Sequence, residues 1–382
     1  MIHLLIGADI VPTPSNEALF AKGDAESLLG KELAQRLAAA DFISLNLETP
    51  LSEGKSPIVK YGPALNASPS AVQGLKKINP FFYTLANNHI LDQDVRGLEA
   101  TMDALKKNGI DFAGVGSTPQ EAARPYIRTV KGVRFGFYCC VEHEFSVVTE
   151  SKAGANPFDP LDSFDAVRDM KAACDFAVVL YHGGKELYQY PSPMLQRVFR
   201  KFADAGADLV IAQHTHCIGC QEKYKNSTLL YGQGNFLFDR NKGPLWETSL
   251  LVDIGFDEKS MRYQLELLPL RKQNEKTSLA AGDDAAKILK EFDQRSASIL
   301  EPGFIQGQYA RLAEQSRLGF YRRFFGRKGK STVTRVLNRL TKNGYLRRNY
   351  GQLNAAEIEN LMACESLREL ALTAMEQQRK KG

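Results

Sequence analysis

The sequence predicts an α/β protein in which parallel strands alternate with helices and antiparallel strands follow. Short apolar runs such as Leu209–Ala212 end abruptly in polar residues, which is typical of strands buried in a parallel sheet. Between such runs lie segments with apolar residues at helical spacing, as in residues 25–40. After Cys220 the pieces become short and alternate in polarity, which indicates antiparallel strands. In open α/β folds the ligand site lies at the carboxyl ends of the strands.

The bulk composition predicts a soluble protein of a reducing compartment. Of the 382 residues, 43% are apolar and 24% are charged, a balance typical of globular proteins. Six cysteines are too few for a disulfide scaffold. The N-terminus MIHLLIGADIVPTP lacks a basic region, and no apolar run approaches the roughly 20 residues of a membrane span. We therefore expect a cytoplasmic protein without a signal peptide, an anchor or a transmembrane segment.

Length and charge distribution predict two parts. The chain is long enough for two domains, or for one large domain with an appendage. Between Arg317 and Asn349 Asp and Glu are absent while Arg and Lys recur, so much of the net charge of +5 lies near the C-terminus. We expect an α/β domain over residues 1–275 and a basic helical extension over residues 283–382.

The first two predicted strands end in acidic or amide side chains. Ile2–Ile6 runs into Asp9, and a carboxylate just past a first strand is a common metal or catalytic position, although it could equally cap a turn. The run Asp41–Leu45 leads into Asn46 and Glu48, which alternation places on one side of an extended chain. Residues 49–69 are rich in Pro, Gly and Ser, which predicts a loop that shapes a pocket.

The next strands end in amide and imidazole side chains. Phe81–Ala86 is followed by Asn88 and His89, with Asp92 three residues further on and a helical stripe after it. Residues 125–139 are typical of a hairpin that turns at Lys131–Gly132.

Three more histidines follow apolar runs. The strand-like run Phe176–Tyr181 ends in His182, and Leu209–Ala212 is followed by His214 and His216. Two histidines at i and i+2 could leave a tight loop toward one point, and neutral imidazole is the commonest transition-metal ligand. A lone His-x-His is weak evidence, and the repeated placement gives it weight.

Together these strand ends predict a two-metal site. Each side chain alone has a plain explanation as a cap, a turn residue or a core histidine, but five such strand ends in one chain are hard to explain by accident. Carboxylate, amide and imidazole ligands without thiolate favour Mn, Fe or Zn. Six or seven such groups exceed the needs of one tetrahedral zinc. They suit a hydrolase whose two divalent ions, about 3.5–4 Å apart, activate water for in-line attack.

The ordered motifs GAD, NLETPL, LANNHILD, HGGKE, AGADLVIAQHTH and YGQGNFLFD resemble those of the CapA branch of the calcineurin-like metallophosphoesterases, named for poly-γ-glutamate capsule synthesis. The resemblance covers roughly residues 1–270, and the spaced set is far more specific than any one motif. It implies a four-layer α/β/β/α sandwich with the metal site at the sheet edges. It also implies a phosphorylated or polyanionic substrate.

The resemblance implies a role for each site residue. Asp9 and His216 would bind the first metal, Glu48 would stand near the bridging position, and Asn88, His182 and His214 would bind the second metal. His89 would protonate or stabilise the leaving group. Asn46 and Asn235 would lie beside these ligands or in the pocket. Asp92 and Asp208 are candidates for the outer acceptors that orient metal-bound imidazoles.

The sequence also departs from the parent superfamily. The position after Ala8-Asp9-Ile10 is Val11 where the usual motif has His, and an Asn-x-Glu pair replaces the usual second Asp. The CapA branch shares both changes. A non-catalytic alternative follows, in which the protein binds metal or polyanion as an assembly factor for capsule polymer synthesis.

Two further motifs are weighed against plainer interpretations. The Cys217-x-x-Cys220 pair could bind zinc, but a single pair is more typical of buried structural cysteine. The run Lys330–Asn349 resembles a winged-helix recognition helix that leads into a wing, which would bind nucleic acid. Because no complete three-helix preamble precedes it, a solvated basic helix is the favoured interpretation and nucleic-acid binding is not expected.

Overall fold

The structure is a computed structural model, and it describes residues 1–324 apart from 55, 61, 241 and 242, then residues 331–349 and the single residues 351, 358, 362 and 375. The chain divides into two compact units, Met1–Gln306 and Gly307–Gly382. Much of the predicted C-terminal extension, including the glycine- and lysine-rich break at residues 326–330, lies outside the described residues.

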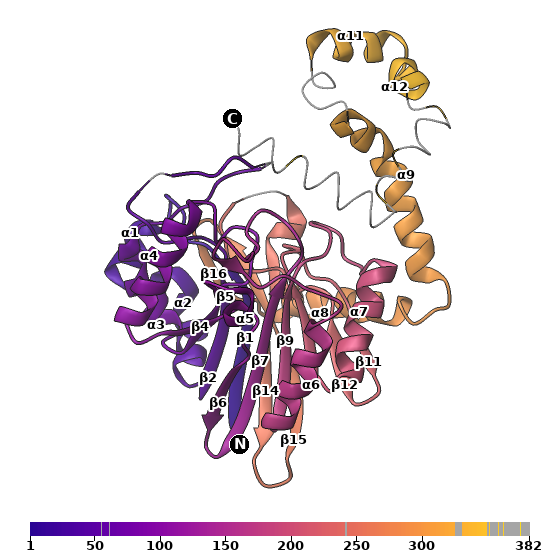
Figure 1. Cartoon of the computed structure of the whole chain (residues 1–382). Coiled ribbons are helices and arrows are strands. Elements are labelled where there is room, and N and C mark those ends of the chain that lie inside the picture. Colours follow the sequence, from indigo (N-terminus) through magenta and orange to yellow (C-terminus); the bar gives the residue numbers. More distant parts are fainter. Residues whose placement is uncertain are drawn as a thin grey trace. The chain divides into compact units, whose positions relative to one another are not determined.

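The first sheet has eight strands in the order β16-β15-β14-β1-β2-β3-β4, with β13 pairing alongside β1 (Figure 1). β1, β2, β3 and β4 are parallel, so their carboxyl ends lie at one edge. The strands are β1 (Ile2–Ile10), β2 (Phe42–Leu47), β3 (Phe82–Thr84), β4 (Asp111–Ala113), β13 (Asn235–Leu237), β14 (Thr248–Asp257), β15 (Arg262–Gln273) and β16 (Lys276–Leu279).

The second sheet has six strands in the order β11-β12-β10-β9-β7-β6. β7, β9, β10 and β12 are parallel, and the β6–β7 hairpin turns at Lys131 and Gly132, both at positive φ, as predicted. The strands are β6 (Tyr126–Val130), β7 (Val133–Val141), β9 (Phe176–His182), β10 (Leu209–Gln213), β11 (Gln221–Tyr224) and β12 (Ser227–Leu230). β5 (Val115–Gly116) and β8 (Gly154–Ala155) form a separate pair.

The strands of both sheets carry apolar side chains on both faces. The inner faces of the two sheets therefore pack against each other, and the outer faces are left for helices to cover. Leu4 and Ile6 of β1 share one buried cluster with Phe137 of β7 and Leu180 of β9. The Phe82 and Phe137 rings lie 5.4 Å apart, which joins the sheets across this core. Figure 1 shows the strands of both sheets running in similar directions.

Helices cover the outer face of each sheet. Leu5 and Leu45 of the first sheet pack against α1 (Glu17–Lys22), α2 (Ala25–Ala38), α3 (Val72–Ile78) and α4 (Asp94–Lys107). Val179 of β9 packs against Phe199 of α7 (Pro193–Asp204) and Val167 of α6 (Ser163–Ala173). The predicted four-layer α/β/β/α sandwich is therefore confirmed (Figure 1). The same unit also contains two 3-10 turns, η1 (Pro69–Ala71) and η2 (Pro244–Trp246), and the short α5 (Pro119–Ala122).

The predicted change to antiparallel strands after Cys220 is correct only in part. β14, β15 and β16 are antiparallel, but β12 pairs parallel to β10 and β13 pairs parallel to β1. Sequence alternation reports which face of a strand is buried, and it does not report the direction of the neighbouring strand.

The unit boundary differs from the predicted division between residues 275 and 283. α8 (Gly282–Ser298) belongs to the first unit, because Phe292 is buried in the cluster between the sheets. Asp284 of this helix accepts a hydrogen bond from Arg271 Nε at 3.0 Å, and Arg295 Nε donates to the Gly219 carbonyl at 2.9 Å. The chain divides only after Gln306, within α9 (Phe304–Phe324).

In the second unit, the predicted wing is wrong. α11 (Thr332–Leu340) ends in a turn in which Lys342 and Asn343 have positive φ, and a second helix, α12 (Gly344–Asn349), follows. None of the helices in the described ranges is both long and apolar enough to cross a membrane.

The placement of α8 predicts the effect of Phe292→Ala. Because this ring is fully buried, its removal should lower the free energy of unfolding of the first unit by about 3–5 kcal/mol, measured by denaturant unfolding. Lys290→Ala, at an exposed position of the same helix, is the matched control. An unchanged midpoint in Phe292→Ala would mean that α8 belongs to an independent appendage.

Candidate metal centre

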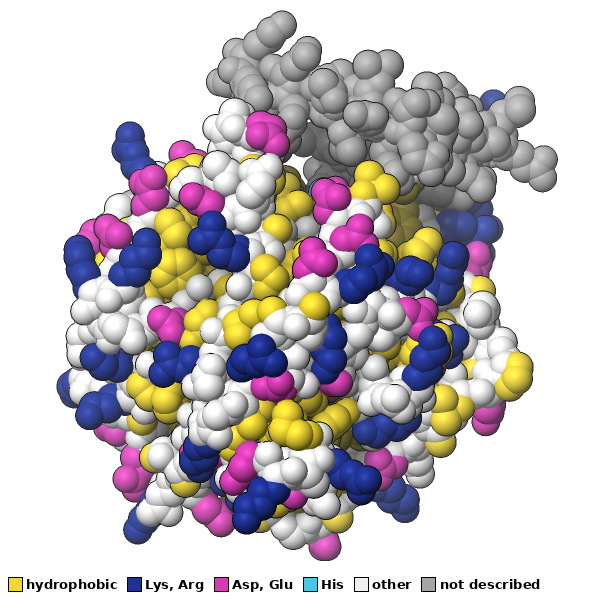
Figure 2. All heavy atoms as spheres, turned by 60° about the horizontal axis from the view of Figure 1, so that its bottom comes forward, with side chains coloured by type: hydrophobic (Ala, Val, Ile, Leu, Met, Phe, Trp, Pro, Cys, Tyr) yellow, Lys and Arg dark blue, Asp and Glu magenta, His cyan; other side chains and the backbone are white. Residues whose placement is uncertain are grey.

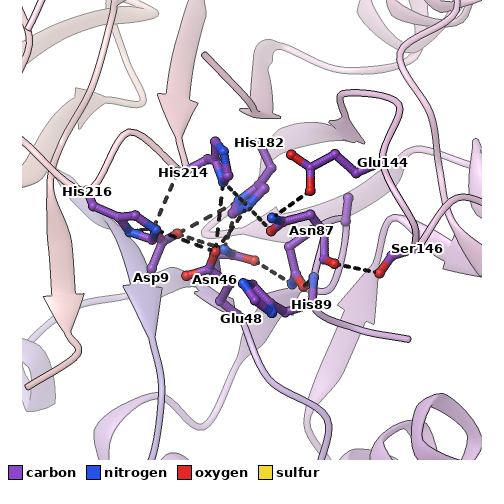
Figure 3. A network of polar contacts seen from close by, with 12 residues as sticks. Asp9, Asn46, Glu48, Asn87, His89, Glu144, Ser146, His182, His214 and His216 are labelled. Atoms are coloured by element: carbon purple, nitrogen blue, oxygen red, sulfur yellow. Dashed lines mark hydrogen bonds and ion pairs between the residues drawn. The ribbon is translucent and has the colours of Figure 1, made fainter. Parts of the chain in front are cut away.

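Side chains from the carboxyl ends of both sheets meet at one centre (Figure 3). In the first sheet, the register places Asp9 of β1 beside Asn46 of β2 and Asn235 of β13. In the second sheet, His182 is the last residue of β9 and pairs with Gln213, the residue before His214. The strand-end residues predicted from the sequence are therefore brought together by sheet register and by the packing of the two sheets.

Glu48 lies at this centre, and its carboxylate is fully buried beside three imidazoles. Neither oxygen accepts a hydrogen bond from any described residue. Oε1 lies 3.3 Å from His182 Nε2 and 4.0 Å from both His214 Nδ1 and His216 Nε2. Candidate ligand atoms of Glu48, His214 and His216 all lie within 4.8 Å of one another. A buried carboxylate ringed by imidazole nitrogens fits a divalent cation, which would satisfy its oxygens.

The loop after β10 aims two imidazoles at this centre through an uncommon backbone conformation. His214 has a φ of 82° and His216 a φ of 54°, both in the left-handed region. Non-glycine residues there cost on the order of 1–3 kcal/mol each and persist where surrounding structure holds them. Hydrogen bonds from Gly183 N to Gln213 O and from Leu187 N to Thr215 O hold this loop. The strain is typical of a functional site.

Asp9 is held by groups that favour its ionised form. Burial raises the pKa of Asp9, but the hydrogen bond from His216 and the charges of His182 and His216 outweigh it and hold the pKa below its usual value. Its Oδ2 lies 3.3 Å from His216 Nδ1 and accepts from the backbone N–H of His214 at 3.3 Å. A carboxylate that stays ionised is the form that binds a cation.

The pKa values of the two histidines of the loop are shifted in opposite directions. Burial and the neighbouring imidazole charges, His182 first, lower the pKa of His214 well below its usual value. Burial also lowers the pKa of His216, but the Glu48 charge and the bond to Asp9 outweigh it and raise that pKa. His214 is therefore neutral, as metal binding requires, and His216 is the imidazole on which protons and a cation would compete.

Asn46 is oriented by a residue that the sequence analysis missed. Asn46 Nδ2 donates to Asp9 Oδ1 at 2.7 Å and lies 3.1 Å from His182 Nδ1. Asn87 Nδ2 in turn donates to Asn46 Oδ1 at 3.0 Å, and Asn87 Oδ1 accepts from the backbone of His89 at 3.1 Å. Asn87 thus ties the ends of β2 and β3 together. The doubled Asn before His89 was the available signal.

Asn88 faces the second group of predicted ligands. Its Oδ1 lies 3.0 Å from His182 Nε2, and His182 Nε2 also lies 3.2 Å from His214 Nδ1. The predicted second-metal ligands Asn88, His182 and His214 are therefore mutual neighbours. Asn88 Nδ2 points the other way and donates to Glu144 Oε2 at 3.0 Å.

His89 lies at the rim and is held by a carboxylate. Its Nδ1 lies 2.6 Å from Asp92 Oδ2, and its side chain keeps 12% of its surface exposed. Asp92 is fully buried and also binds the Lys60 ammonium and the backbone N–H of Leu65. Asp92 was predicted to orient a metal-bound imidazole. It contacts His89 instead, which is not among the predicted metal ligands. Lys60, from the predicted pocket loop, was not foreseen.

Asn235 contacts the ring nitrogen of His216 that is turned away from Glu48. Asn235 Oδ1 lies 2.7 Å from His216 Nδ1, which leaves His216 Nε2 facing Glu48. Trp246 packs against the same imidazole, with ring centroids 4.4 Å apart. Lys272 Nζ donates to the Asn235 carbonyl at 3.3 Å, and burial lowers the pKa of this lysine to about 7. Lys272 was also missed.

Two predicted candidates lie apart from the centre. Asp208 binds Lys171 Nζ and the backbone N–H of Ala177, both at 2.7 Å, so the prediction that it orients a metal ligand is wrong. Cys217 and Cys220 are buried and unbridged, and burial raises the pKa of Cys217 to about 12. A buried thiol of this kind fits the structural interpretation.

Comparisons with known proteins place this chain among capsule synthesis proteins. A family model described as bacterial capsule synthesis protein PGA_cap matches residues 4–240. Capsule biosynthesis protein CapA of Bacillus anthracis is 28% identical over 219 residues, which cover 55% of this chain and 53% of that protein. PGA biosynthesis protein CapA of Bacillus subtilis (strain 168) is 28% identical over 210 residues, covering 53% and 54%. The match thus spans about half the length of these curated relatives.

Solved structures with partial similarity include two hydrolases. A novel phosphatase from Mycoplasma pneumoniae gives a TM-score of 0.45 at 13% identity, covering 72% of this chain and 94% of that one. A 5'-nucleotidase precursor from Thermus thermophilus gives a TM-score of 0.39 at 15% identity, covering 77% of this chain and 58% of that one.

The burial of Lys272 predicts a pH-dependent stability. Its pKa is 10.5 when exposed and about 7 in the folded protein, so protonation favours the unfolded state. The resulting penalty is absent above pH 10.5, grows as the pH falls toward 7 and is complete below 7. Lys272→Met should therefore raise the melting temperature of the metal-stripped protein, by a margin that widens between pH 10 and pH 7. Each unit of pKa difference is worth about 1.4 kcal/mol.

Lys276→Met, at an exposed position of β16, is the control for this measurement and should show no such trend. A melting-temperature difference for Lys272→Met that stays constant across this pH range would show that Lys272 is not buried in its neutral form.

Proposed function

Because the chain belongs to the family of bacterial capsule synthesis proteins described as PGA_cap, we propose that it is a metal-dependent phosphoesterase of that family. The observation that carries the proposal is the Glu48 carboxylate, which is fully buried, accepts no hydrogen bond from a described residue and faces three histidines. No described group other than imidazole offsets its charge, so the surroundings of Glu48 suit a bound cation.

The donors divide into two groups that share Glu48. Asp9 and His216 would hold one divalent ion, and Asn88, His182 and His214 would hold a second one, with Glu48 between them. These donors comprise carboxylate, amide oxygen and imidazole, which suits Mn, Fe or Zn. Two ions bound there would supply Lewis-acid activation of water and would neutralise the phosphoryl oxygens during in-line displacement.

His89 is the proton donor of the proposed reaction. Asp92 accepts from His89 Nδ1, so Nε2 is left to carry a proton toward a leaving-group oxygen. The buried Asp92 carboxylate fixes the orientation of the imidazole, and the Lys60 ammonium pairs with its other oxygen and lies 3.2 Å from His89 Nδ1. This arrangement favours turnover over binding alone, because a site that only binds a polyanion needs no oriented proton donor.

We propose that the substrate is a phosphorylated or polyanionic compound of capsule-type polymer synthesis, as the names of the relatives suggest. On the face drawn in Figure 2, Lys and Arg side chains are interspersed with Asp and Glu, so that face offers no broad basic field for a polymer. Cations bound at the centre would attract such an anion. A cytoplasmic location is part of the proposal. The alternative is an assembly factor that binds metal or polyanion without turnover.

Metal reconstitution tests this function. Protein stripped with a chelator and reloaded separately with Mn, Fe, Zn or Mg should regain hydrolysis of a phosphomonoester or a phosphodiester with at least one of the first three metals. Asp9→Asn and His214→Ala should abolish that turnover because each removes a donor from the centre. His3→Ala, which changes a histidine of β1 that pairs with Asp253, is the control and should keep full activity.

Turnover that persists in both site variants would contradict the proposal. Stoichiometric metal binding without turnover on any substrate in the panel would favour the assembly factor.

His89→Ala separates the proton donor from the ligands. Because His89 contacts Asp92 and is outside both donor groups, this variant should bind metal as the wild type does. Its kcat should fall about 10²–10⁴-fold, and the loss should be smaller for substrates whose leaving group needs no protonation. Equal losses for leaving groups of high and low pKa would mean that His89 has no role as an acid.

A further inference from the structure

The segment Glu142–Ser146 leaves the carboxyl end of β7 in the second sheet and contacts the loop that follows β3 in the first (Figure 3). Ser146 Oγ donates to the Asn88 carbonyl at 2.7 Å and accepts from the backbone N–H of Leu91 at 3.3 Å. These two bonds fix the backbone on both sides of His89.

Glu144 selects one orientation of the Asn88 amide. An asparagine amide has an oxygen at one end and an NH₂ group at the other, and rotation by about 180° exchanges them. Asn88 Nδ2 donates to Glu144 Oε2 at 3.0 Å, so Oδ1 is turned toward His182, 3.0 Å from its Nε2. Without an acceptor at the outer end, the NH₂ group could face the centre, where it cannot bind a cation.

Glu142 holds the loop that carries His182, which belongs to the same donor group as Asn88. Its Oε1 accepts from the backbone N–H of Gly184 at 3.0 Å and from the Tyr181 hydroxyl at 3.3 Å, on both sides of His182. The contact is close, since a Cβ on Gly183 would lie 2.6 Å from the Glu142 carboxyl carbon. Gly183 is therefore required for Glu142 to approach the loop that carries His182.

The two halves of the centre are held differently. Asn46 contacts Asp9 and Asn235 contacts His216, so neutral amides support the first donor group, and Asn46 Nδ2 also lies 3.1 Å from His182 Nδ1 of the second group. The second group is supported by the two carboxylates of one segment. Among the described residues, Glu142, Glu144 and Ser146 contact the centre only on the side of the second group.

We propose that Glu144 is a positioning residue that turns the Asn88 oxygen toward the centre and so sets the affinity of the second cation position, with Glu142 and Ser146 fixing the adjoining backbone. The inference rests on the proposed two-ion centre. It predicts that the two positions can be emptied independently, because Glu144 contacts no donor of the Asp9–His216 group.

Manganese titration of the full-length protein tests this inference. Free Mn²⁺ would be measured by electron paramagnetic resonance in wild type, Glu144→Ala and Glu144→Gln. We expect wild type to bind two ions with the spectrum of a spin-coupled pair. Glu144→Ala should keep one ion at unchanged affinity, bind the second about 10–100-fold more weakly and show the signal of an isolated ion. Glu144→Gln should recover much of the second-site affinity because its carbonyl can still accept from Asn88.

Glu150→Ala, an exposed carboxylate of the same connecting segment, is the control and should bind two ions. The inference is overturned if Glu144→Ala binds both ions as tightly as wild type, or if it loses both positions equally. A wild type that binds a single ion overturns it together with the two-ion part of the proposed function. Two ions in the wild type without turnover would refute the phosphoesterase but leave the role of Glu144 intact.

Discussion

The arrangement of the rest of the centre depends on one constraint. The Glu48 carboxylate is buried away from water, and none of the described residues donates a hydrogen bond to it. Its oxygens face His182, His214 and His216. An isolated buried charge is costly, and in proteins such charges are paired or coordinate metals. The same buried surroundings shift the pKa values of the side chains near Glu48. The pKa of His214 is lowered by burial and the pKa of Asp9 is held down by its partners, so both are in the form that a cation requires.

The four-layer sandwich makes this arrangement possible because it brings two sets of parallel strand ends to the same edge. Neither sheet alone holds a complete donor set, since Asp9 and Glu48 belong to the first sheet and the imidazoles belong to the second. The apolar cluster between the sheets, which includes Phe82 and Phe137, fixes their relative position. That core also offsets the left-handed backbone of His214 and His216.

Much of the fold and the donor set could be predicted from sequence because both leave local signals. Apolar runs that end in polar residues marked the strands, and repetition of that placement predicted the candidate donors from Asp9 to His216, which the fold brings together. The hydrogen bonds and ion pairs of the residues around these candidate donors leave no such signal in the sequence. Asp208 follows an Ala-Gly-Ala turn much as the donors follow strands, yet it binds Lys171. Glu144 and Lys60 come from loops, and their contacts depend on how distant segments pack. The unit boundary was misplaced because α8 is polar outside the few residues, such as Phe292, that enter the core.

The charges around the centre order its binding steps. Without cations, the buried Asp9 and Glu48 carboxylates lie beside His214, whose pKa is lowered, and His216, whose pKa is raised, and Glu144 adds a carboxylate at the rim. The carboxylates disfavour a phosphate or a polyanion at this point. Two divalent ions would more than offset Asp9 and Glu48 and reverse the sign of the field. In the proposed function, cations would therefore bind before the anion, in an enzyme and in an assembly factor alike. The two functions differ instead at His89. Lys60 pairs with one oxygen of Asp92 while the other oxygen holds the His89 imidazole, and only the proposed enzyme would use that imidazole to transfer a proton.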